Sequence, residues 1–243
     1  MEVTCWKSWW AKKTMYFPWY PRAGALLKLS YAKKKFNDPD IFKLSSLKLE
    51  KSIYQIDVGG IPPGYRKIKE KTDELKFSMA SDLQTGSLLR TLAASKPSGR
   101  FLELGTGTGL ATSWITAALD ENSTLISIDN DALLMNVAMK YINDGKIEFI
   151  LGDAYEWIKN YHGSKFDFIF ADAMPGKYDL FEETIDMLNH GGLYIIDDML
   201  PQPNWPEGHD EQVKNLIDNL EKRNDLVITK LNWSTGIIIA VKK

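Results

Sequence analysis

The sequence has a single cysteine, Cys5, in 243 residues. One thiol can build neither a disulfide framework nor a thiolate metal site, and such scarcity is typical of proteins in reducing compartments. The chain also lacks any uninterrupted apolar stretch of about 18 residues, which a transmembrane helix would require. A disulfide-stabilised secreted domain and a membrane-spanning protein are therefore not expected, and the composition predicts a cytoplasmic protein.

The formal net charge is only −2, but the charges are unevenly placed. Residues 1–36 hold eight Lys and Arg residues against one acidic residue, Glu2, and four of the eight tryptophans. We interpret residues 1–76 as a basic, aromatic N-terminal extension with a helical cap, and residues 77–243 as the main domain. The extension is expected to act as a lid or as the arm of a homodimer. Peripheral contact of residues 1–36 with an anionic membrane is the less favoured alternative.

From residue 100 onward, short apolar segments alternate with segments of helical spacing. This alternation predicts an α/β fold with a doubly wound, mostly parallel sheet that is covered on both faces. The expected strands are Arg100–Leu104, Leu125–Asp129, Ile147–Leu151, Phe166–Ala171 and Leu193–Asp197. The expected helices are Ser81–Ala94, Leu110–Leu119, Ala132–Ile142, Ala154–Tyr161, Tyr178–Leu188 and Glu207–Arg223.

The end of the chain departs from this alternation. Two further strands are expected at Leu226–Leu231 and Gly236–Val241, and only Asn232–Thr235 separates them. Four residues are too few for a helical crossover, so the pair should form an antiparallel hairpin. The predicted sheet is therefore Rossmann-like and seven-stranded, with an antiparallel C-terminal hairpin.

A glycine-rich loop, residues 105–109, follows the first expected strand with the sequence Gly-Thr-Gly-Thr-Gly. Its glycines permit close backbone approach, and the next helix offers free N–H groups to a polar or anionic ligand. The spacing differs from the GxGxxG of dinucleotide sites, and Glu103 precedes the first glycine by two residues. A carboxylate there would oppose a pyrophosphate but suits a ligand that carries an amino group and a sulfonium. A purely structural turn is the alternative interpretation.

Polar residues also follow the second and third strands. Asp129, with Asn130 beside it, ends the second strand, where a carboxylate can accept hydrogen bonds from ribose hydroxyls, including those of NAD. Gly152, Asp153 and Ala154 follow the third strand. Asp153 could accept a hydrogen bond from an adenine amino group, cap the next helix, or do both.

Asp172, Asp197 and Asp198 lie at the ends of the fourth and fifth strands. The carboxyl ends of parallel strands line the ligand crevice, so oxygens from these two loops could bind Mg²⁺ or another divalent cation. Polar contacts to a ligand amino group and helix caps are the alternatives. Asp197 and Asp198 can share one metal only if the strand has ended there, since adjacent strand residues point to opposite faces.

These motifs, in this order, resemble the class I S-adenosylmethionine-dependent methyltransferases, specifically a bacterial branch of the catechol/caffeoyl-CoA O-methyltransferase group. The resemblance covers residues 77–243 and also rests on residues 79–81, on Gly86 and on Phe168–Tyr178. It implies S-adenosylmethionine-dependent methylation of a small-molecule hydroxyl, with Mg²⁺ or another divalent cation as a candidate second cofactor. A nucleic-acid acceptor is not expected, because residues 37–243 are acidic. An NAD-linked oxidoreductase, which the C-terminal hairpin disfavours, and a non-catalytic S-adenosylmethionine-binding module are the alternatives.

The resemblance also assigns roles to individual positions. The implied cofactor-binding residues are Met79, Ala80, Ser81, Glu103, Gly105, Thr106, Gly107, Asp129, Asn130, Gly152, Asp153, Ala154 and Asp172. Among these, residues 79–81 would border the methionine moiety and Glu103 its polar end. The implied metal ligands are Asp172, Asp197 and Asp198, although the third position is usually Asn in the family.

The acceptor side departs from the family pattern. Metal-dependent members have a lysine near the acceptor hydroxyl, as general base, three residues after the first ligand, and Pro175 stands at that position here. Lys177 could replace this lysine only if the loop follows a different path. His209, in the proline-rich segment after Asp198, is the other candidate base, and Trp205 either walls the acceptor pocket or packs on the next helix. The expected catalytic residues are Asp172, Lys177 and His209.

Overall fold

The computed structural model describes residues 60–203 and 205–243. These residues belong to one compact unit, Ile56–Lys243. The predictions for residues 1–36, namely a lid, a dimer arm or a membrane contact, lie outside the described residues. Within the part of the chain that is described, no helix is long and apolar enough to cross a membrane.

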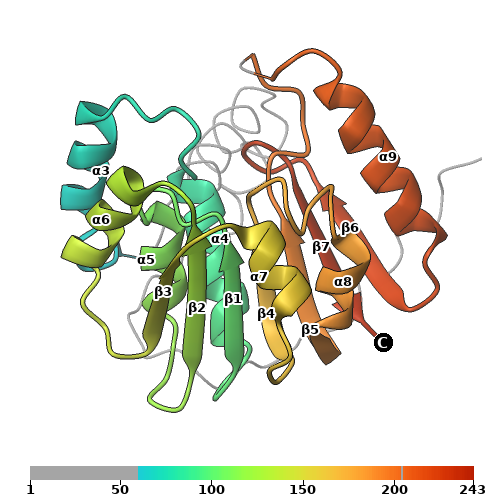
Figure 1. The fold of residues 1–243 in the computed structure, drawn as a ribbon, viewed down its shortest axis with the longest axis horizontal. Coiled ribbons are helices and arrows are strands. Elements are labelled where there is room, and N and C mark those ends of the chain that lie inside the picture. Colours follow the sequence, from blue (N-terminus) through green and yellow to red (C-terminus); the bar gives the residue numbers. More distant parts are fainter. Residues whose placement is uncertain (1–59, 204) are drawn as a thin grey trace, which may run out of the picture. The chain divides into compact units, whose positions relative to one another are not determined.

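Seven strands form a single sheet (Figure 1). The strands are β1 (Arg100–Leu104), β2 (Thr124–Asp129), β3 (Ile147–Leu151), β4 (Phe166–Ala171), β5 (Leu188–Ile196), β6 (Leu226–Leu231) and β7 (Ile237–Lys242). Their order is β3-β2-β1-β4-β5-β7-β6, in which β1 to β5 are parallel and β7 is antiparallel to both β5 and β6. The predicted α/β fold with its closing hairpin is confirmed.

The strand β5 begins earlier than the expected Leu193. It starts at Leu188 and includes Gly191 and Gly192, and its pairing with β4 changes register between Phe166 and Phe168. Gly191 has a φ of 76°, which glycine adopts without steric cost. Glycines in a strand often mark such an irregularity, and the sequence pattern suggested a turn instead.

Helices cover both faces of the sheet (Figure 1). They are α3 (Tyr65–Glu74), α4 (Leu83–Ala94), α5 (Leu110–Thr116), α6 (Ala132–Tyr141), α7 (Ala154–Asn160), α8 (Phe181–Asp186) and α9 (His209–Lys222). Alternate side chains of a strand point to opposite faces. Accordingly, Leu102 and Leu104 pack in the core beneath α7, α8 and α9, whereas Phe101 packs in the core beneath α4 and α5.

Helix α3 packs with the sheet domain, although it falls within the region expected to form an N-terminal cap. Its Tyr65 and Ile68 are buried in one cluster with Trp114 of α5 and Ala138 of α6. The Tyr65 and Trp114 rings meet edge to face, with their centroids 5.7 Å apart. Hydrophobic burial therefore fixes α3 on the same core as α5 and α6.

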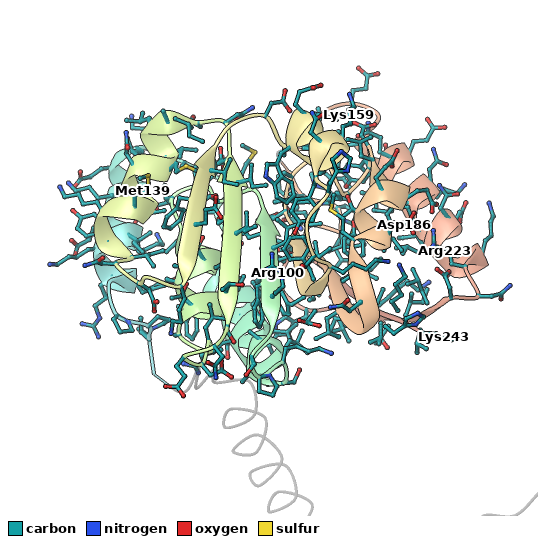
Figure 2. The ribbon with its side chains drawn as sticks, turned by 60° about the horizontal axis from the view of Figure 1, so that its bottom comes forward. Arg100, Met139, Lys159, Asp186, Arg223 and Lys243 are labelled. Carbon is teal, nitrogen blue, oxygen red and sulfur yellow. The ribbon has the colours of Figure 1, made fainter. Side chains whose placement is uncertain are left out.

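Figure 2, with the bottom of Figure 1 turned forward, shows the edge of the sheet where the parallel strands begin. Arg100, which starts β1, and Lys243, which follows β7, both lie at this edge, as antiparallel β7 requires (Figure 2). The carboxyl ends of β1 to β5 therefore share the opposite edge. In doubly wound sheets that edge binds ligands.

Gly86 permits a close approach between α4 and α5, and this contact yields a stability prediction. A Cβ at Gly86 would lie 2.2 Å from Cδ1 of the fully buried Trp114. Gly86→Ala is expected to lower the free energy of unfolding by about 1–3 kcal/mol, because overpacking outweighs the gain in helix propensity. Urea denaturation would measure this loss. Gly145→Ala is the control, since its Cβ would meet nothing within 4 Å. Equal stability of the two variants would contradict the prediction.

Candidate active site

A large cavity opens at the carboxyl ends of the parallel strands. Its volume is about 1010 Å³, and the glycine loop, residues 75–81 and the loops after β2, β4 and β5 line it. A smaller hollow of about 340 Å³ shares Gly105, Asp129 and Asn130 with the cavity and extends to Gly152–Tyr155. Most residues expected to bind a cofactor therefore come together, although they arise from five separate segments of the chain.

The glycine loop is held tightly against its neighbours. The N–H groups of Gly105 and Thr106 both donate to the carbonyl of Ile128, at 3.0 and 3.2 Å. Gly105 has a φ of 100°, and a Cβ there would lie 2.7 Å from the carbonyl oxygen of Asp172. Only glycine combines this backbone conformation with such a close approach. The loop after β4 is thus pressed onto the glycine loop, and Asp172 lies in the cavity wall beside it.

Asp129 connects the glycine loop with the end of β2. One of its carboxylate oxygens accepts a hydrogen bond from the Gly107 N–H at 2.7 Å, and the other accepts from the Asp131 N–H at 2.8 Å. Its side chain is partly exposed and lines both hollows. Since carboxylate oxygens have several lone pairs, Asp129 retains acceptor capacity toward the cavity.

Asp153 caps α7, one of the two roles predicted from the sequence. Its carboxylate accepts a hydrogen bond from the Tyr155 N–H at 2.7 Å. Gly152, Asp153 and Ala154 also line the smaller hollow, together with Tyr155. The cap leaves the second carboxylate oxygen available to a ligand there.

The structure corrects the expected role of Glu103. Its side chain is fully buried and does not line the cavity. One oxygen, Oε2, accepts hydrogen bonds from the hydroxyls of Thr112 on α5 and Ser127 on β2. Strand alternation explains this position, because Glu103 shares the face of Phe101 and therefore points beneath α5.

Glu103 instead supports the glycine loop through a buried chain of hydroxyls. The Ser127 hydroxyl, which donates to Glu103, also shares a 2.7 Å hydrogen bond with the Thr106 hydroxyl. The other carboxylate oxygen of Glu103 has no hydrogen-bond partner among the described residues. Burial raises the pKa of Glu103 to about 7, against the lowering effect of the two hydroxyls.

Residues 79–81, which the family resemblance assigns to the methionine moiety, line the cavity. Met79 is 66% exposed, so its apolar side chain is available to a ligand. The Ser81 hydroxyl donates a hydrogen bond to the Asp172 carboxylate at 3.2 Å. This contact links the wall to the loop after β4.

Asp172, Asp197 and Asp198 reach the same cavity but do not form the expected metal site. Among the described residues, no group of three His, Cys, Asp or Glu side chains is arranged to hold a metal ion. The buried Asp197 carboxylate instead accepts hydrogen bonds from the Thr235 hydroxyl at 2.6 Å and from the Asp198 N–H at 2.8 Å. Asp198 has a φ of 55°, so the strand has ended and its side chain takes a direction that strand alternation does not predict.

Two carboxyls of this acidic group have raised pKa values. Burial raises the pKa of Asp172 well above its usual range, and the charges of Asp197 and Asp198 raise it further. Burial likewise raises the pKa of Asp197 to about 6. The positive charge of Lys177 acts in the other direction and lowers the pKa of both Asp172 and Asp197. Its ammonium group therefore lies close enough to influence both carboxyls.

Aromatic side chains and His209 line the part of the cavity near Asp198 and Lys177. The Tyr178 hydroxyl and Nε2 of His209, the first residue of α9, are 3.1 Å apart and hydrogen-bonded. The Trp205 ring packs edge to face on His209, with centroids 4.6 Å apart. Burial and the nearby Lys177 lower the pKa of His209, which is therefore neutral near pH 7.

Two residues of this part of the cavity were not singled out from the sequence. Tyr178 was assigned to a helix, but α8 begins only at Phe181, which leaves Tyr178 in the loop that faces the cavity. Thr235 lies in the hairpin turn between β6 and β7 and orients Asp197. No local pattern marks either residue, because both reach the site through long-range packing.

The chain has relatives among O-methyltransferases. A family model described as "O-methyltransferase" matches residues 65–243. A candidate O-methyltransferase of Mycolicibacterium vanbaalenii is 26% identical over 117 residues, which are 46% of this chain and 52% of the relative. A candidate O-methyltransferase of Mycolicibacterium smegmatis is 24% identical over 134 residues, 53% of this chain and 63% of the relative. The aligned part of the chain thus spans little more than half the length of these curated relatives.

Solved structures share the fold. The O-methyltransferase TomG from Streptomyces achromogenes, solved in complex with SAM, superposes with a TM-score of 0.69 at 20% identity, over 81% of this chain and 96% of TomG. An O-methyltransferase from Bacillus cereus, in complex with SAH, gives a TM-score of 0.67 at 17% identity, over 82% and 97% of the two chains. The family match covers well over half of the sequence, including every strand of the sheet and every residue of the cavity walls. The chain therefore belongs to the O-methyltransferase family.

Proposed function

We propose that this protein transfers the methyl group of S-adenosylmethionine to a hydroxyl group of a small molecule. The observation that carries the proposal is the single cavity that joins the glycine loop to the Lys177, Tyr178 and His209 side chains. Besides backbone N–H groups and carboxylates, the cavity offers an ammonium group, aromatic rings and a base, which would form the acceptor end. Family membership and the bound SAM and SAH of proteins with the same fold support this proposal.

The cofactor would occupy the glycine-loop end. Asp129 is suited to accept hydrogen bonds from the ribose hydroxyls, with Asn130 beside it. The hollow at Gly152–Tyr155 would hold the adenine, with Asp153 accepting from its amino group. Residues 79–81 and Asp172 would border the methionine moiety, which directs the sulfonium methyl toward the acceptor end.

Methyl transfer itself is a displacement in which the acceptor oxygen attacks the methyl carbon in line with the departing sulfur. Alignment of the two reactants can supply about 7–11 kcal/mol of the barrier reduction. The acceptor hydroxyl must also lose its proton. His209 is neutral near pH 7 and hydrogen-bonded to Tyr178, so this pair would receive the proton at Nε2.

The proposal does not include a divalent cation. Oδ1 of Asp197 already accepts hydrogen bonds from Thr235 and from the Asp198 N–H, the positive charge of Lys177 acts on Asp172 and Asp197, and no three acidic or His side chains among the described residues are arranged to hold a metal ion. These side chains therefore do not fit the metal site that the family resemblance implies. The rival nucleotide-linked oxidoreductase is disfavoured by family membership and by the antiparallel β7.

Ligand binding tests the proposal directly. S-adenosylhomocysteine is expected to raise the melting temperature of the full chain, and NAD is not. Asp129→Asn should weaken S-adenosylhomocysteine binding about 10- to 100-fold, because it removes a charged acceptor and disturbs the Gly107 contact. Calorimetric titration would measure the change, with Glu148→Gln, an exposed site on β3, as the control. Binding of NAD in preference to S-adenosylhomocysteine would overturn the proposed cofactor.

A turnover assay separates an enzyme from a non-catalytic binding module. We expect S-adenosylhomocysteine to form from S-adenosylmethionine when a phenolic or catecholic acceptor is present. Cofactor binding without turnover on any hydroxyl acceptor would favour the module instead.

A further inference from the structure

The loop between β4 and α8 is folded so that Lys177 cannot point to solvent. The carbonyl of Met174 accepts hydrogen bonds from the N–H groups of Lys177, Tyr178 and Asp179, at 3.3, 3.0 and 3.3 Å. Three donors on one carbonyl define a compact turn. The family lysine would stand at position 175, where this chain has Pro175. The turn is the different loop path that lets Lys177, two residues further along, reach the cavity instead.

Gly176 anchors this turn on the sheet. Its φ is 82°, and a Cβ there would lie 2.3 Å from Cδ1 of Leu104, a fully buried residue of β1. The buried Tyr194 of β5 donates its hydroxyl hydrogen bond to the Gly176 carbonyl. The position of Lys177 is therefore fixed from both sides by the core of the sheet.

Lys177 is only 4% exposed, whereas lysine side chains are normally almost fully solvated. It nevertheless lines the large cavity, and its Nζ lies 5.2 Å from the centroid of the Tyr178 ring. Its charge acts on Asp172, on Asp197 and on His209. A buried cation thus lies near both the carboxyls and the candidate base.

Within the described ranges, Lys177 has no carboxylate close enough for a salt bridge. A buried ammonium group without a direct ion partner retains hydrogen-bond donors, and here they can be directed only into the cavity that it lines. The surrounding carboxyls compensate its charge at longer range. This arrangement resembles a site prepared for an anionic oxygen atom.

We propose that Lys177 is the built-in cation of the acceptor site and takes the place of a divalent metal. The inference rests on the proposed function, because the oxygen it would face belongs to the methyl acceptor. In the transfer step, the O–H bond of the acceptor breaks and its proton passes to the Tyr178–His209 pair. The O–C bond forms while the methyl–sulfur bond breaks, and the electron pair of that bond leaves on sulfur. The Lys177 ammonium stabilises the oxyanion until the new bond forms.

Titration with Mn²⁺, followed by electron spin resonance, tests the metal side of this inference without any turnover. The full chain with bound S-adenosylhomocysteine is expected to show no saturable Mn²⁺ site at millimolar concentration. A stoichiometric site that Asp172→Asn abolishes would overturn the inference. Because this readout is independent of methyl transfer, failure of the proposed function would appear separately, as failure to bind S-adenosylhomocysteine.

The second measurement uses 4-nitrocatechol, whose absorption spectrum reports the ionisation of its hydroxyl groups. Added to the S-adenosylhomocysteine complex near pH 6, it is expected to bind as the anion in the parent and in Lys177→Arg. Lys177→Met is expected to weaken binding of the anion about 100-fold, a loss of the size that removal of one oxyanion-hole donor causes in kcat. Lys165→Met, at an exposed position before β4, is the matched control.

The spectra of the bound 4-nitrocatechol decide whether Lys177 stabilises the anion. Equal spectra for the parent and Lys177→Met, including the case in which neither binds the anion, would overturn the role of Lys177. A melting temperature and S-adenosylhomocysteine affinity equal to those of the parent would show that Lys177→Met is folded. A signal that falls in Lys177→Met and persists in Lys177→Arg and Lys165→Met would support the inference.

Discussion

Replacement of His209 by alanine is expected to lower kcat for methyl transfer about 10²- to 10⁴-fold, the usual contribution of a positioned general base. The reason is geometric, since Nε2 of His209 is hydrogen-bonded to Tyr178 at the acceptor end of the cavity. S-adenosylhomocysteine formation with a phenolic acceptor would measure the rate. The affinity for S-adenosylhomocysteine should stay within a factor of about two, because the contacts of His209 are with Tyr178 and Trp205 and not with the glycine loop.

The pH profile provides an independent check on this role. A general base acts in its neutral form, so activity should rise as pH increases through the pKa of His209. Burial and Lys177 lower this pKa from its usual value of 6.5, which places the acidic limb of the profile below that value. The control is His162→Ala, at an exposed position after α7. If His209→Ala retains the parent rate, another group must accept the proton.

The second large effect concerns the stability of the protein as a function of pH. The pKa of the buried Glu103 is about 7 in the folded state, compared with 4.5 for the unperturbed group. Between these two pH values the folded protein holds a proton that the unfolded chain has released. Stability must therefore fall as pH rises through this window, by about 3 kcal/mol in total for Glu103.

Glu103→Gln is expected to remove this part of the pH dependence. Urea denaturation of the parent and the variant between about pH 5 and pH 8 would reveal it as a flatter stability curve. Asp172 and Asp197 contribute slopes of the same sign, so the informative quantity is the difference between the two curves. Glu148→Gln, at an exposed site on β3, should leave the slope of the parent unchanged. Parallel curves for the parent and Glu103→Gln would contradict the raised pKa.

Local sequence patterns predicted the strand bounds well where the burial of a short apolar segment alone decides them. The strands β1, β3, β4 and β6 have the predicted bounds, because each is a short apolar run between polar or glycine residues. The short connection after β6 was sufficient to predict the antiparallel hairpin. Prediction was wrong at the start of β5, where glycines are accommodated within an irregular strand.

Most of the residues expected at the site do line the cavity, but not all of their contacts were predicted. The glycine loop, Asp129 and Asp153 lie where parallel topology places the carboxyl ends of strands, so their convergence could be expected. Glu103 was assigned to the ligand, although strand alternation directs it beneath α5. Asp172, Asp197 and Asp198 do converge, but their hydrogen bonds and the insertion of Lys177 could not be inferred from spacing.

The sequence by itself determined the α/β architecture, most strand bounds and the position of the glycine loop, because periodicity and glycine placement are local properties. Only the tertiary structure decided what stands at the acceptor end. The packing of Gly176 on Leu104 and the hydrogen bond from Tyr194 fix a turn that buries Lys177. Those contacts join β1, β5 and the loop after β4, which are distant in sequence. The direction of a buried side chain in a loop, such as that of Lys177, depends on such long-range packing, and no local pattern encodes it.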